Sequence, residues 1–231
     1  MSDPEARRGA RPYLEILADL HRMLAPRGYV EIGVRAGHSL ALATCPALGI
    51  DPAPALRLPL PDTTRVLTMT SDAWAASNPV LSWPLDLAFI DGLHTADQVA
   101  RDFIALERLA HPGTVIVLDD IYPNHPEQAR RERVTKTWTR DVWLFLEALH
   151  AVRDDLTLIS LDSSPTGLLL VAGFNQDVDK TLVGRRELAL QEMCRQEKTT
   201  VPEHVLKRHY ALDPDPALIG KIADAIRRQR P

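Results

Sequence analysis

Short apolar runs alternate with helical patterns along the central part of the chain. In several runs the apolar side chains occupy consecutive positions, as in Val115-Ile116-Val117-Leu118. Strands with one wet face alternate apolar and polar residues, whereas strands covered on both faces of a parallel sheet do not. The pattern therefore predicts an α/β fold with a parallel sheet and helices on both faces. The predicted strands are Tyr29–Val34, Leu48–Asp51, Val66–Thr70, Leu85–Asp91 and Thr114–Asp119.

Apolar residues at helical spacing predict helices around these strands. Thr95 and Gln98 have the spacing of a capping box before one helix, and Pro112-Gly113 ends it. A proline-rich stretch over residues 51–61 excludes a continuous helix or a central strand. The predicted helices cover residues 13–24, 39–45, 97–110 and 142–152.

The last two predicted strands are close together in sequence. Leu156–Leu161 and Gly167–Phe174 are separated by a turn-like stretch that contains Pro165, which predicts an antiparallel hairpin at the end of the sheet. Further helices are expected over residues 187–197 and 216–228. The predicted organisation is an N-terminal helix in residues 1–27, a central domain in residues 28–175 and a C-terminal helical extension in residues 176–231.

Charge and composition narrow the class of protein. The chain has 231 residues and a formal net charge of -4, so it lacks the basic excess that neutralises phosphates, and nucleic acid is not an expected partner. No apolar stretch is long enough for a signal peptide or a membrane span, which predicts a cytoplasmic protein with no membrane partner. Cys45 and Cys194 form no metal-binding or disulfide pattern and are expected to be reduced and packed.

The first predicted strand runs directly into a glycine-containing turn, Glu31-Ile32-Gly33-Val34-Arg35-Ala36-Gly37-His38-Ser39. Ligands of open α/β sheets bind at the carboxyl ends of the strands, and the first strand-to-helix turn commonly holds a cofactor. Glycine lets ligand and backbone approach closely, although a tight turn also needs glycine for steric reasons. The Gly-x-x-x-Gly spacing differs from the Gly-x-Gly-x-x-Gly of dinucleotide-binding folds.

Polar residues also follow the next two strands. Asp51 ends the second strand, where its carboxylate could accept hydrogen bonds from both hydroxyls of a ribose or could cap a turn. Ser71 and Asp72 follow the third strand, where an adenine edge would be read or where they are simply turn residues. These three residues are candidates for a nucleoside site.

The densest group of ionisable residues lies after the fourth and fifth strands. Asp91 and His94 follow one strand, and Asp119-Asp120 ends the other, so these side chains should converge at one edge of the sheet. Adjacent buried carboxylates repel each other, and a divalent cation coordinated by oxygens removes that cost. We infer a hard metal ion, Mg²⁺, near these residues. His94 belongs to the site or bonds a nearby loop.

At these residues the sequence resembles the class I S-adenosylmethionine-dependent methyltransferases. More narrowly, it is similar to bacterial metal-dependent O-methyltransferases of sugars and natural products, including the macrolide sugar methyltransferases. The resemblance covers roughly residues 28–174. It is carried by Val30-Glu31-Ile32-Gly33 with Gly37, Phe89-Ile90-Asp91-Gly92 with His94, Val117-Leu118-Asp119-Asp120, Thr139-Arg140-Asp141-Val142-Trp143 and Pro165-Thr166-Gly167-Leu168.

The resemblance implies a Rossmann-like sheet of seven strands with the last one antiparallel. It also implies transfer of a methyl group to a hydroxyl of a small molecule, a sugar or natural product, with His94 as the general base. Asp119 departs from the family pattern, because relatives carry glutamate there. The candidate cofactor-binding residues are Glu31, Gly33, Gly37, Ser39, Asp51, Ser71, Asp72 and Asp91, and the candidate metal ligands are Asp91, Asp119 and Asp120.

Two other classes share this sheet. A nucleotide-dependent oxidoreductase would need the other glycine spacing and has no use for Asp119-Asp120. A catalytically retired binding or scaffold subunit would not need to retain the acidic residues and His94. The segment over residues 122–140, rich in arginine, is either a substrate-side lid or a solvated loop. Apolar faces on the terminal helices make a homo-oligomer plausible, and the sequence does not identify the acceptor.

Overall fold

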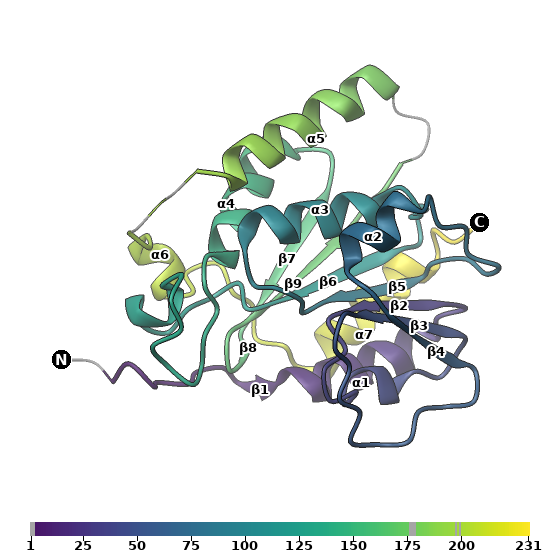
Figure 1. Cartoon of the computed structure of the whole chain (residues 1–231), viewed down its shortest axis with the longest axis horizontal. Coiled ribbons are helices and arrows are strands. Elements are labelled where there is room, and N and C mark those ends of the chain that lie inside the picture. The colour runs from purple at the N-terminus through teal and green to yellow at the C-terminus, as the bar shows by residue number, and fades with distance from the viewer. Residues whose placement is uncertain (1–2, 176–178, 197, 199) are drawn as a thin grey trace.

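The computed structural model describes residues 3–175, 179–196, 198 and 200–231. Within these residues the centre of the protein is a seven-stranded sheet with the order β4-β3-β2-β5-β6-β9-β7 (Figure 1). Strands β2 to β6 pair in parallel, and β9 runs antiparallel to both β6 and β7. The predicted α/β fold with a terminal antiparallel hairpin is confirmed. The strands are β2 (Tyr29–Ile32), β3 (Ala47–Asp51), β4 (Thr64–Thr68), β5 (Leu87–Ile90), β6 (Val115–Asp119), β7 (Thr157–Leu161) and β9 (Leu168–Ala172).

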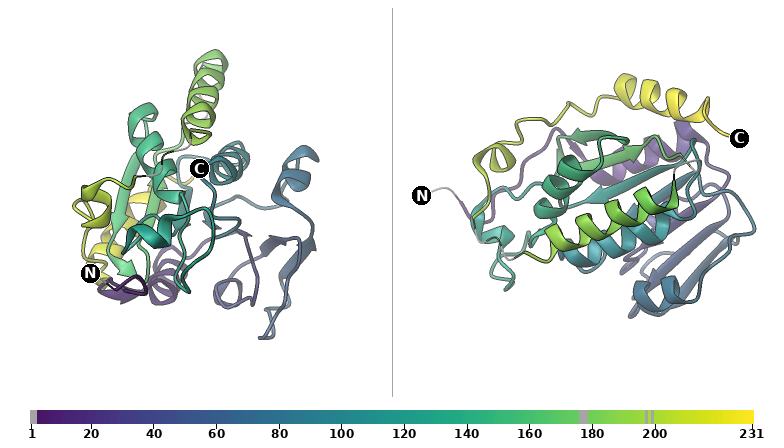
Figure 2. Two further views of the ribbon diagram at one scale, coloured as in Figure 1. Left: turned by 60° about the vertical axis from the view of Figure 1, so that its left-hand side comes forward. Right: turned by 90° about the horizontal axis from the view of Figure 1, so that it is seen from above.

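Successive side chains of the central strands enter two different cores. In β5, Leu87 and Phe89 belong to one core, whereas Ala88 and Ile90 belong to the other. Helices cover both faces of the sheet, as Figures 1 and 2 show, so every position of β5 is buried. This double cover explains why the strands are apolar at consecutive positions.

The first core lies under two helices from opposite ends of the chain. The helix α1 (Tyr13–Leu24) forms over the range that the sequence predicts, and α7 (Pro216–Arg227) packs beside it (Figure 1). The other core lies under α3 (Ala96–Glu107) and α4 (Val142–Val152), and α5 (Lys180–Cys194) packs along both of them (Figure 2, right). No helix in the described part of the chain is both long and apolar enough to cross a membrane.

The remaining elements are short. The N-terminal segment contributes β1 (Arg11–Pro12), which pairs in parallel with β8 (Ser163–Ser164). A short helix, α2 (Ser71–Ala76), follows β4, and α6 (Glu203–Leu206) lies between α5 and α7. A 3₁₀ turn, η2 (Pro126–Ala129), lies in the loop after β6.

Three predicted boundaries were wrong. The helix expected over residues 39–45 is a single 3₁₀ turn, η1 (Leu40–Leu42), because Pro46 disfavours helix at the residue before it and β3 begins directly afterwards. The third strand both begins and ends two residues earlier than expected, at Thr64 and Thr68, and Thr70 instead caps the helix that begins at Ser71. The helix predicted over residues 187–197 begins earlier, at Lys180, and ends at Cys194; residue 197 lies outside the described residues.

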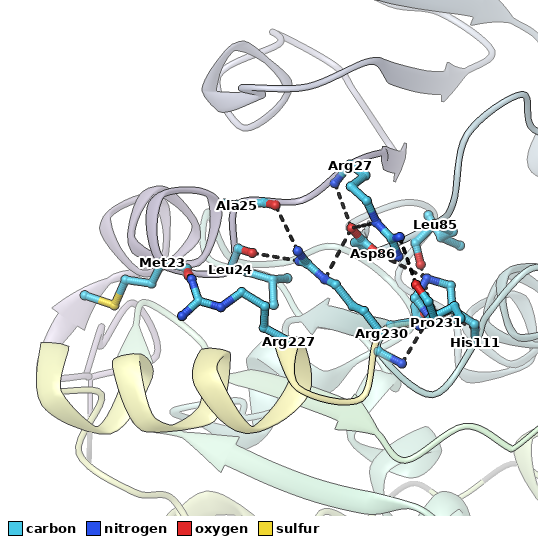
Figure 3. A network of polar contacts seen from close by, with 12 residues as sticks. Met23, Leu24, Ala25, Arg27, Leu85, Asp86, His111, Arg227, Arg230 and Pro231 are labelled. Carbon is cyan, nitrogen blue, oxygen red and sulfur yellow. Dashed lines mark hydrogen bonds and ion pairs between the residues drawn. The ribbon is translucent and has the colours of Figure 1, made fainter.

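The C-terminus is tied to the edge of the sheet opposite the carboxyl ends of the parallel strands. Asp86 precedes β5 and is fully buried, and its carboxylate accepts hydrogen bonds from the backbone and side chain of Arg27. His111 lies 3.0 Å and Arg230 lies 3.4 Å from the same carboxylate (Figure 3). Arg230 also donates to the carbonyls of Ala25 and Leu24, which close α1. This network fastens α7 and the chain end against α1.

Candidate active site

A cavity of about 740 Å³ opens at the carboxyl ends of the central parallel strands. Its walls come from the ends of β2, β3, β5 and β6, from the start of α2, from α3 and from the segment 133–138. This is the edge at which open α/β sheets bind ligands. Its size falls in the range of about 300–1,000 Å³ that is typical of small-molecule sites.

Three ionisable side chains meet in this cavity. The imidazole Nδ1 of His94 lies 2.6 Å from Oδ2 of Asp120, and its Nε2 lies 3.3 Å from Oδ1 of Asp91. One potential ligand atom from each residue lies within 4.8 Å of the others. Chain folding therefore brings together residues from the ends of β5 and β6, as parallel strand geometry predicts.

The ionisable groups of this cluster shift one another's pKa values. Burial alone would lower the pKa of His94, but the charges and hydrogen bonds of Asp120 and Asp91 raise it well above its ordinary value. Burial, together with the charges of Asp120 and Asp91, raises the pKa of Asp119 well above its ordinary value. Carboxylates that resist ionisation in this way would be stabilised by a positive charge placed among them.

Asp119 occupies a different place from the other predicted metal ligands. Its Oδ1 accepts a hydrogen bond of 2.8 Å from the backbone N–H of Asp120, and the side chain lines the cavity. Its carboxylate is not among the ligand atoms that gather within 4.8 Å, which come from Asp91, His94 and Asp120. Its role as a metal ligand stays a prediction.

The predicted cofactor residues in and around the glycine turn fall into two groups, those that line the cavity and those that do not. Gly33 lines the cavity at a φ of 93°, and a side-chain carbon there would lie 2.0 Å from the carbonyl oxygen of Asp91. Glu31, Gly37 and Ser39 do not line the cavity in the described structure. Glu31 is instead buried beneath the turn, where it accepts hydrogen bonds of 2.6 Å from the hydroxyl of Tyr29 and 2.7 Å from that of Ser39.

Burial dominates the ionisation of Glu31. It raises the pKa of this carboxyl to about 8, against the opposing effect of the two hydroxyl donors. Glu31 therefore supports the turn through Ser39, and a direct contact with a cofactor stays a prediction.

Asp51 joins two loops at the cavity wall. Its two oxygens accept hydrogen bonds of 2.7 Å each from the backbone N–H groups of Arg35 and Ala53. The side chain also lines the cavity, and each carboxylate oxygen keeps a second lone pair for a ligand. Asp51 is thus held in a fixed orientation at the position where the sequence predicts a ribose contact.

Ser71 and Asp72 lie on the first turn of α2 and also line the cavity. The amide of Gln98 donates to Ser71 Oγ at 3.1 Å and to Asp72 Oδ1 at 3.0 Å. It also donates to Asp102, one turn further along α3, at 2.9 Å. Asp102 is 2% exposed, and burial raises its pKa to about 6. The predicted site does not include Gln98 or Asp102, although two polar residues four apart on a helix that follows the predicted site are a signal that the sequence contains.

Thr95 caps α3, where its hydroxyl accepts from the backbone N–H of Gln98 at 3.3 Å. Only this half of the predicted capping box forms, because the Gln98 side chain is engaged at the cavity wall.

The segment 122–140 forms part of the cavity wall. The ring of Trp138 stacks on the imidazole of His94 at a centroid distance of 5.8 Å and an interplanar angle of 15°. The guanidinium of Arg133 lies 5.7 Å from the centre of the same indole ring. Arg7, from the N-terminal segment, and Lys136 line the cavity as well. The contribution of Arg7 could not be predicted, because it depends on contacts between segments more than a hundred residues apart.

Comparison with known proteins identifies the fold. A family model described as a methyltransferase domain matches residues 30–121. No curated protein sequence matches the chain. Among solved structures, the chain is similar to an O-methyltransferase from Bacillus cereus in complex with SAH, with 16% identity, a TM-score of 0.51 and coverage of 69% of this chain and 79% of that chain.

Two further structures give the same result. The O-methyltransferase TomG from Streptomyces achromogenes, in complex with SAM, is 16% identical with a TM-score of 0.54, over 71% of this chain and 80% of that chain. The SAH-bound methyltransferase PaMTH1 from Podospora anserina is 12% identical with a TM-score of 0.53, over 71% of this chain and 78% of that chain. At these identities the likeness establishes a shared fold.

Proposed function

Since the chain is a class I S-adenosylmethionine-dependent methyltransferase by its fold and its methyltransferase domain, we propose that it is a divalent-metal-dependent O-methyltransferase acting on a hydroxyl of a small molecule. The observation that carries the proposal is the meeting of Asp91, His94 and Asp120 inside the cavity. A sugar or another natural product is the acceptor that the family resemblance favours.

The cofactor end of the cavity is the part lined by the turns after β2 and β3 and by α2. Gly33 lets the turn after β2 pack against the backbone of Asp91 at the cavity wall, and Asp51 presents an oriented carboxylate of the kind that binds ribose hydroxyls. Ser71 and Asp72 supply polar groups beyond Asp51, and Gln98 holds both of them. S-adenosylmethionine bound here supplies the methyl group.

The residues fit a hard divalent cation. Asp91 and Asp120 offer carboxylate oxygens, which are the ligands that Mg²⁺ prefers, and the repulsion among buried carboxylates is relieved by positive charge. Asp119 is positioned to add a further oxygen or to orient Asp120 through its backbone N–H. A metal bound by these residues would lower the pKa of an acceptor hydroxyl.

His94 is the proposed general base, and its hydrogen bonds define which atom takes the proton. Nδ1 lies 2.6 Å from Asp120 Oδ2 and 3.1 Å from the carbonyl of Trp138, two acceptors that favour a proton on Nδ1. Nε2 lies 3.3 Å from Asp91 Oδ1, and the raised pKa of His94 favours a protonated ring while no other cation neutralises the carboxylates. A cation held by Asp91 and Asp120 would oppose this protonation and leave a lone pair on Nε2. Asp120 and Trp138 orient the ring, and Nε2 accepts the hydroxyl proton as the methyl group transfers.

Calorimetric titration with S-adenosylhomocysteine, with and without Mg²⁺, tests the cofactor part of this proposal without knowledge of the acceptor. We expect micromolar binding under both conditions. Absence of binding under both would overturn the proposed function. Methyl transfer from labelled S-adenosylmethionine to a panel of hydroxyl compounds, with EDTA as the control, then tests metal dependence, and turnover that persists in EDTA would remove the metal from the mechanism.

A further inference from the structure

Two segments that are distant in sequence build the wall of the cavity beside His94. The side chain of Gln128 donates to the carbonyls of Pro4 and Ala6, and the backbone N–H of Lys136 donates to the carboxylate of Glu5. The N-terminal segment therefore lies against the loop after β6, and Figure 1 shows the two running side by side. Because Trp138 of this loop stacks on His94, the wall lies on the acceptor side of the proposed base.

Three cationic side chains of this wall lack an ion pair among the described residues, although Asp91, Asp119 and Asp120 line the same cavity. Arg7, Arg133 and Lys136 all line the cavity, and within the described residues none of them forms an ion pair with a carboxylate. Neighbouring arginines of the same loop behave differently, since Arg130 pairs with Glu127 at 2.9 Å and Arg131 pairs with Asp141 at 3.1 Å. Arg133 and Lys136 are the cations of this loop that line the cavity.

Arg133 is also held in place. Its Nη2 donates to the carbonyl of Lys136 at 2.8 Å, its Nε donates to the carbonyl of Thr135 at 3.3 Å, and its guanidinium lies over the Trp138 ring. A guanidinium has five N–H donors, so several remain for a ligand. A fixed, unpaired guanidinium in a cavity is suited to binding a phosphate or a carboxylate.

A buried hydroxyl in the same cavity also lacks a partner. Thr166 is 1% exposed and lines the cavity, and its Oγ1 has no hydrogen-bond partner among the described residues. Burying a hydroxyl without a hydrogen bond is unfavourable unless a ligand supplies the missing partner.

We propose that the acceptor is an anion, a hydroxylated small molecule whose phosphate or carboxylate group is bound by Arg7, Arg133 and Lys136 while its hydroxyl lies at His94. This inference rests on the proposed function and specifies its substrate class.

The first test uses the full chain saturated with S-adenosylhomocysteine, so that the cofactor's own carboxylate is already in place. Inorganic pyrophosphate and citrate are titrated by calorimetry at low salt into the wild type, Arg133→Gln, Lys136→Gln and Arg7→Gln. Arg130→Gln is the matched control, because Arg130 lies in the same loop and is paired with Glu127. We expect each cavity variant to weaken anion binding by about fivefold or more, with the control within about twofold.

Two calorimetric results would overturn the inference. One is that neither anion binds the saturated wild type, and the other is that all variants bind as the wild type does. A loss of S-adenosylhomocysteine affinity in Arg133→Gln and Lys136→Gln would also overturn it, because the cations would then serve the cofactor.

A second test compares matched acceptors that differ only in charge, such as catechol with protocatechuate and glucose with its phosphate esters. We expect the charged member of a pair to be methylated with the lower KM, and we expect Arg133→Gln and Lys136→Gln to remove this preference. Preferred turnover of the neutral members would overturn the inference while leaving the methyltransferase proposal standing. Failure of S-adenosylhomocysteine to bind at all would instead overturn the proposed function.

Discussion

The imidazole of His94 and the carboxylate of Asp120 lie 2.6 Å apart, and both residues have left-handed backbone conformations, with φ of 57° and 64°. Such conformations cost on the order of 1–3 kcal/mol for residues other than glycine and persist only where the surrounding structure enforces them. His94 lies shortly after the buried strand β5, and Asp120 directly follows the buried strand β6, so the two strands hold these side chains close to each other. The surrounding structure therefore enforces the pairing of these two side chains.

Replacement of Asp120 by asparagine should separate chemistry from cofactor binding. The amide can no longer carry the negative charge that orients and polarises His94, so we expect methyl transfer to fall by at least about 100-fold. S-adenosylhomocysteine affinity, measured by calorimetry, should change by less than about threefold. Asp62→Asn, at an exposed position away from the cavity, is the control. A large loss of cofactor affinity in Asp120→Asn would contradict the assignment.

Replacement of Asp51 should have the opposite effect. Asp51→Asn keeps the shape of the side chain but removes the charge that we expect to accept ribose hydroxyls, so the Kd for S-adenosylhomocysteine should rise by about 10-fold or more. Asp51 also accepts from the backbone of Arg35 and Ala53, and circular dichroism and Tm of the free variant therefore check that the turn persists. An unchanged Kd in a folded variant would remove Asp51 from the cofactor site.

Glu31 should make the stability of the free protein depend on pH. Its pKa is raised from 4.5 to about 8 in the folded state, so the folded chain holds this proton more tightly than the unfolded chain between those values. Stability then falls as pH rises through this window, by up to about 1.4 kcal/mol per pH unit. In Glu31→Gln this loss should be absent.

Urea unfolding of the wild type and Glu31→Gln from about pH 5 to about pH 8 measures the difference in slope. Glu15→Gln, at a side chain that is 59% exposed, is the control. Parallel pH profiles for wild type and Glu31→Gln would show that Glu31 is ionised throughout.

Asp86 should contribute to stability without affecting the site. Its carboxylate is 0% exposed and binds Arg27, His111 and Arg230 (Figure 3), so Asp86→Ala removes several hydrogen bonds to charged groups and should cost about 1.5–3 kcal/mol in urea unfolding. The burial of Asp86 opposes ionisation, but its hydrogen bonds to Arg27 lower its pKa below the ordinary value. This stabilisation is therefore present above the ordinary aspartate pKa and is lost as pH falls through the lowered value.

The comparison for this variant is Asp154→Ala, which removes an aspartate whose side chain is 90% exposed in its pair with Arg186. It should cost less than about 1 kcal/mol. S-adenosylhomocysteine affinity should be unchanged in both variants, because Asp86 lies at the opposite edge of the sheet from the cavity. Equal stabilities of the two variants would show that the network at the C-terminus contributes little.

The sequence by itself determined the strands and their parallel arrangement. The consecutive apolar residues of β5 and β6 are a local property of the sequence, and such strands are stable only when both faces of the sheet are covered. From that arrangement followed the meeting of Asp91, His94 and Asp120, since the carboxyl ends of neighbouring parallel strands share one edge. The cap of α3 at Thr95 is likewise a local property of a few residues.

Tertiary structure decided the features that depend on distant segments or on competition between neighbours. The predicted helix after the glycine turn is reduced to η1, because the space before β3 and Pro46 overrides the local helical pattern. The placement of Glu31 beneath the turn and of Asp119 outside the cluster depends on side-chain directions that spacing does not encode. The approach of Arg7 to the cavity depends on contacts of the N-terminal segment with the loop after β6. The periodicity of the sequence predicts which face of a helix or strand is buried, whereas only the packing of the folded chain decides which distant residue contacts that face.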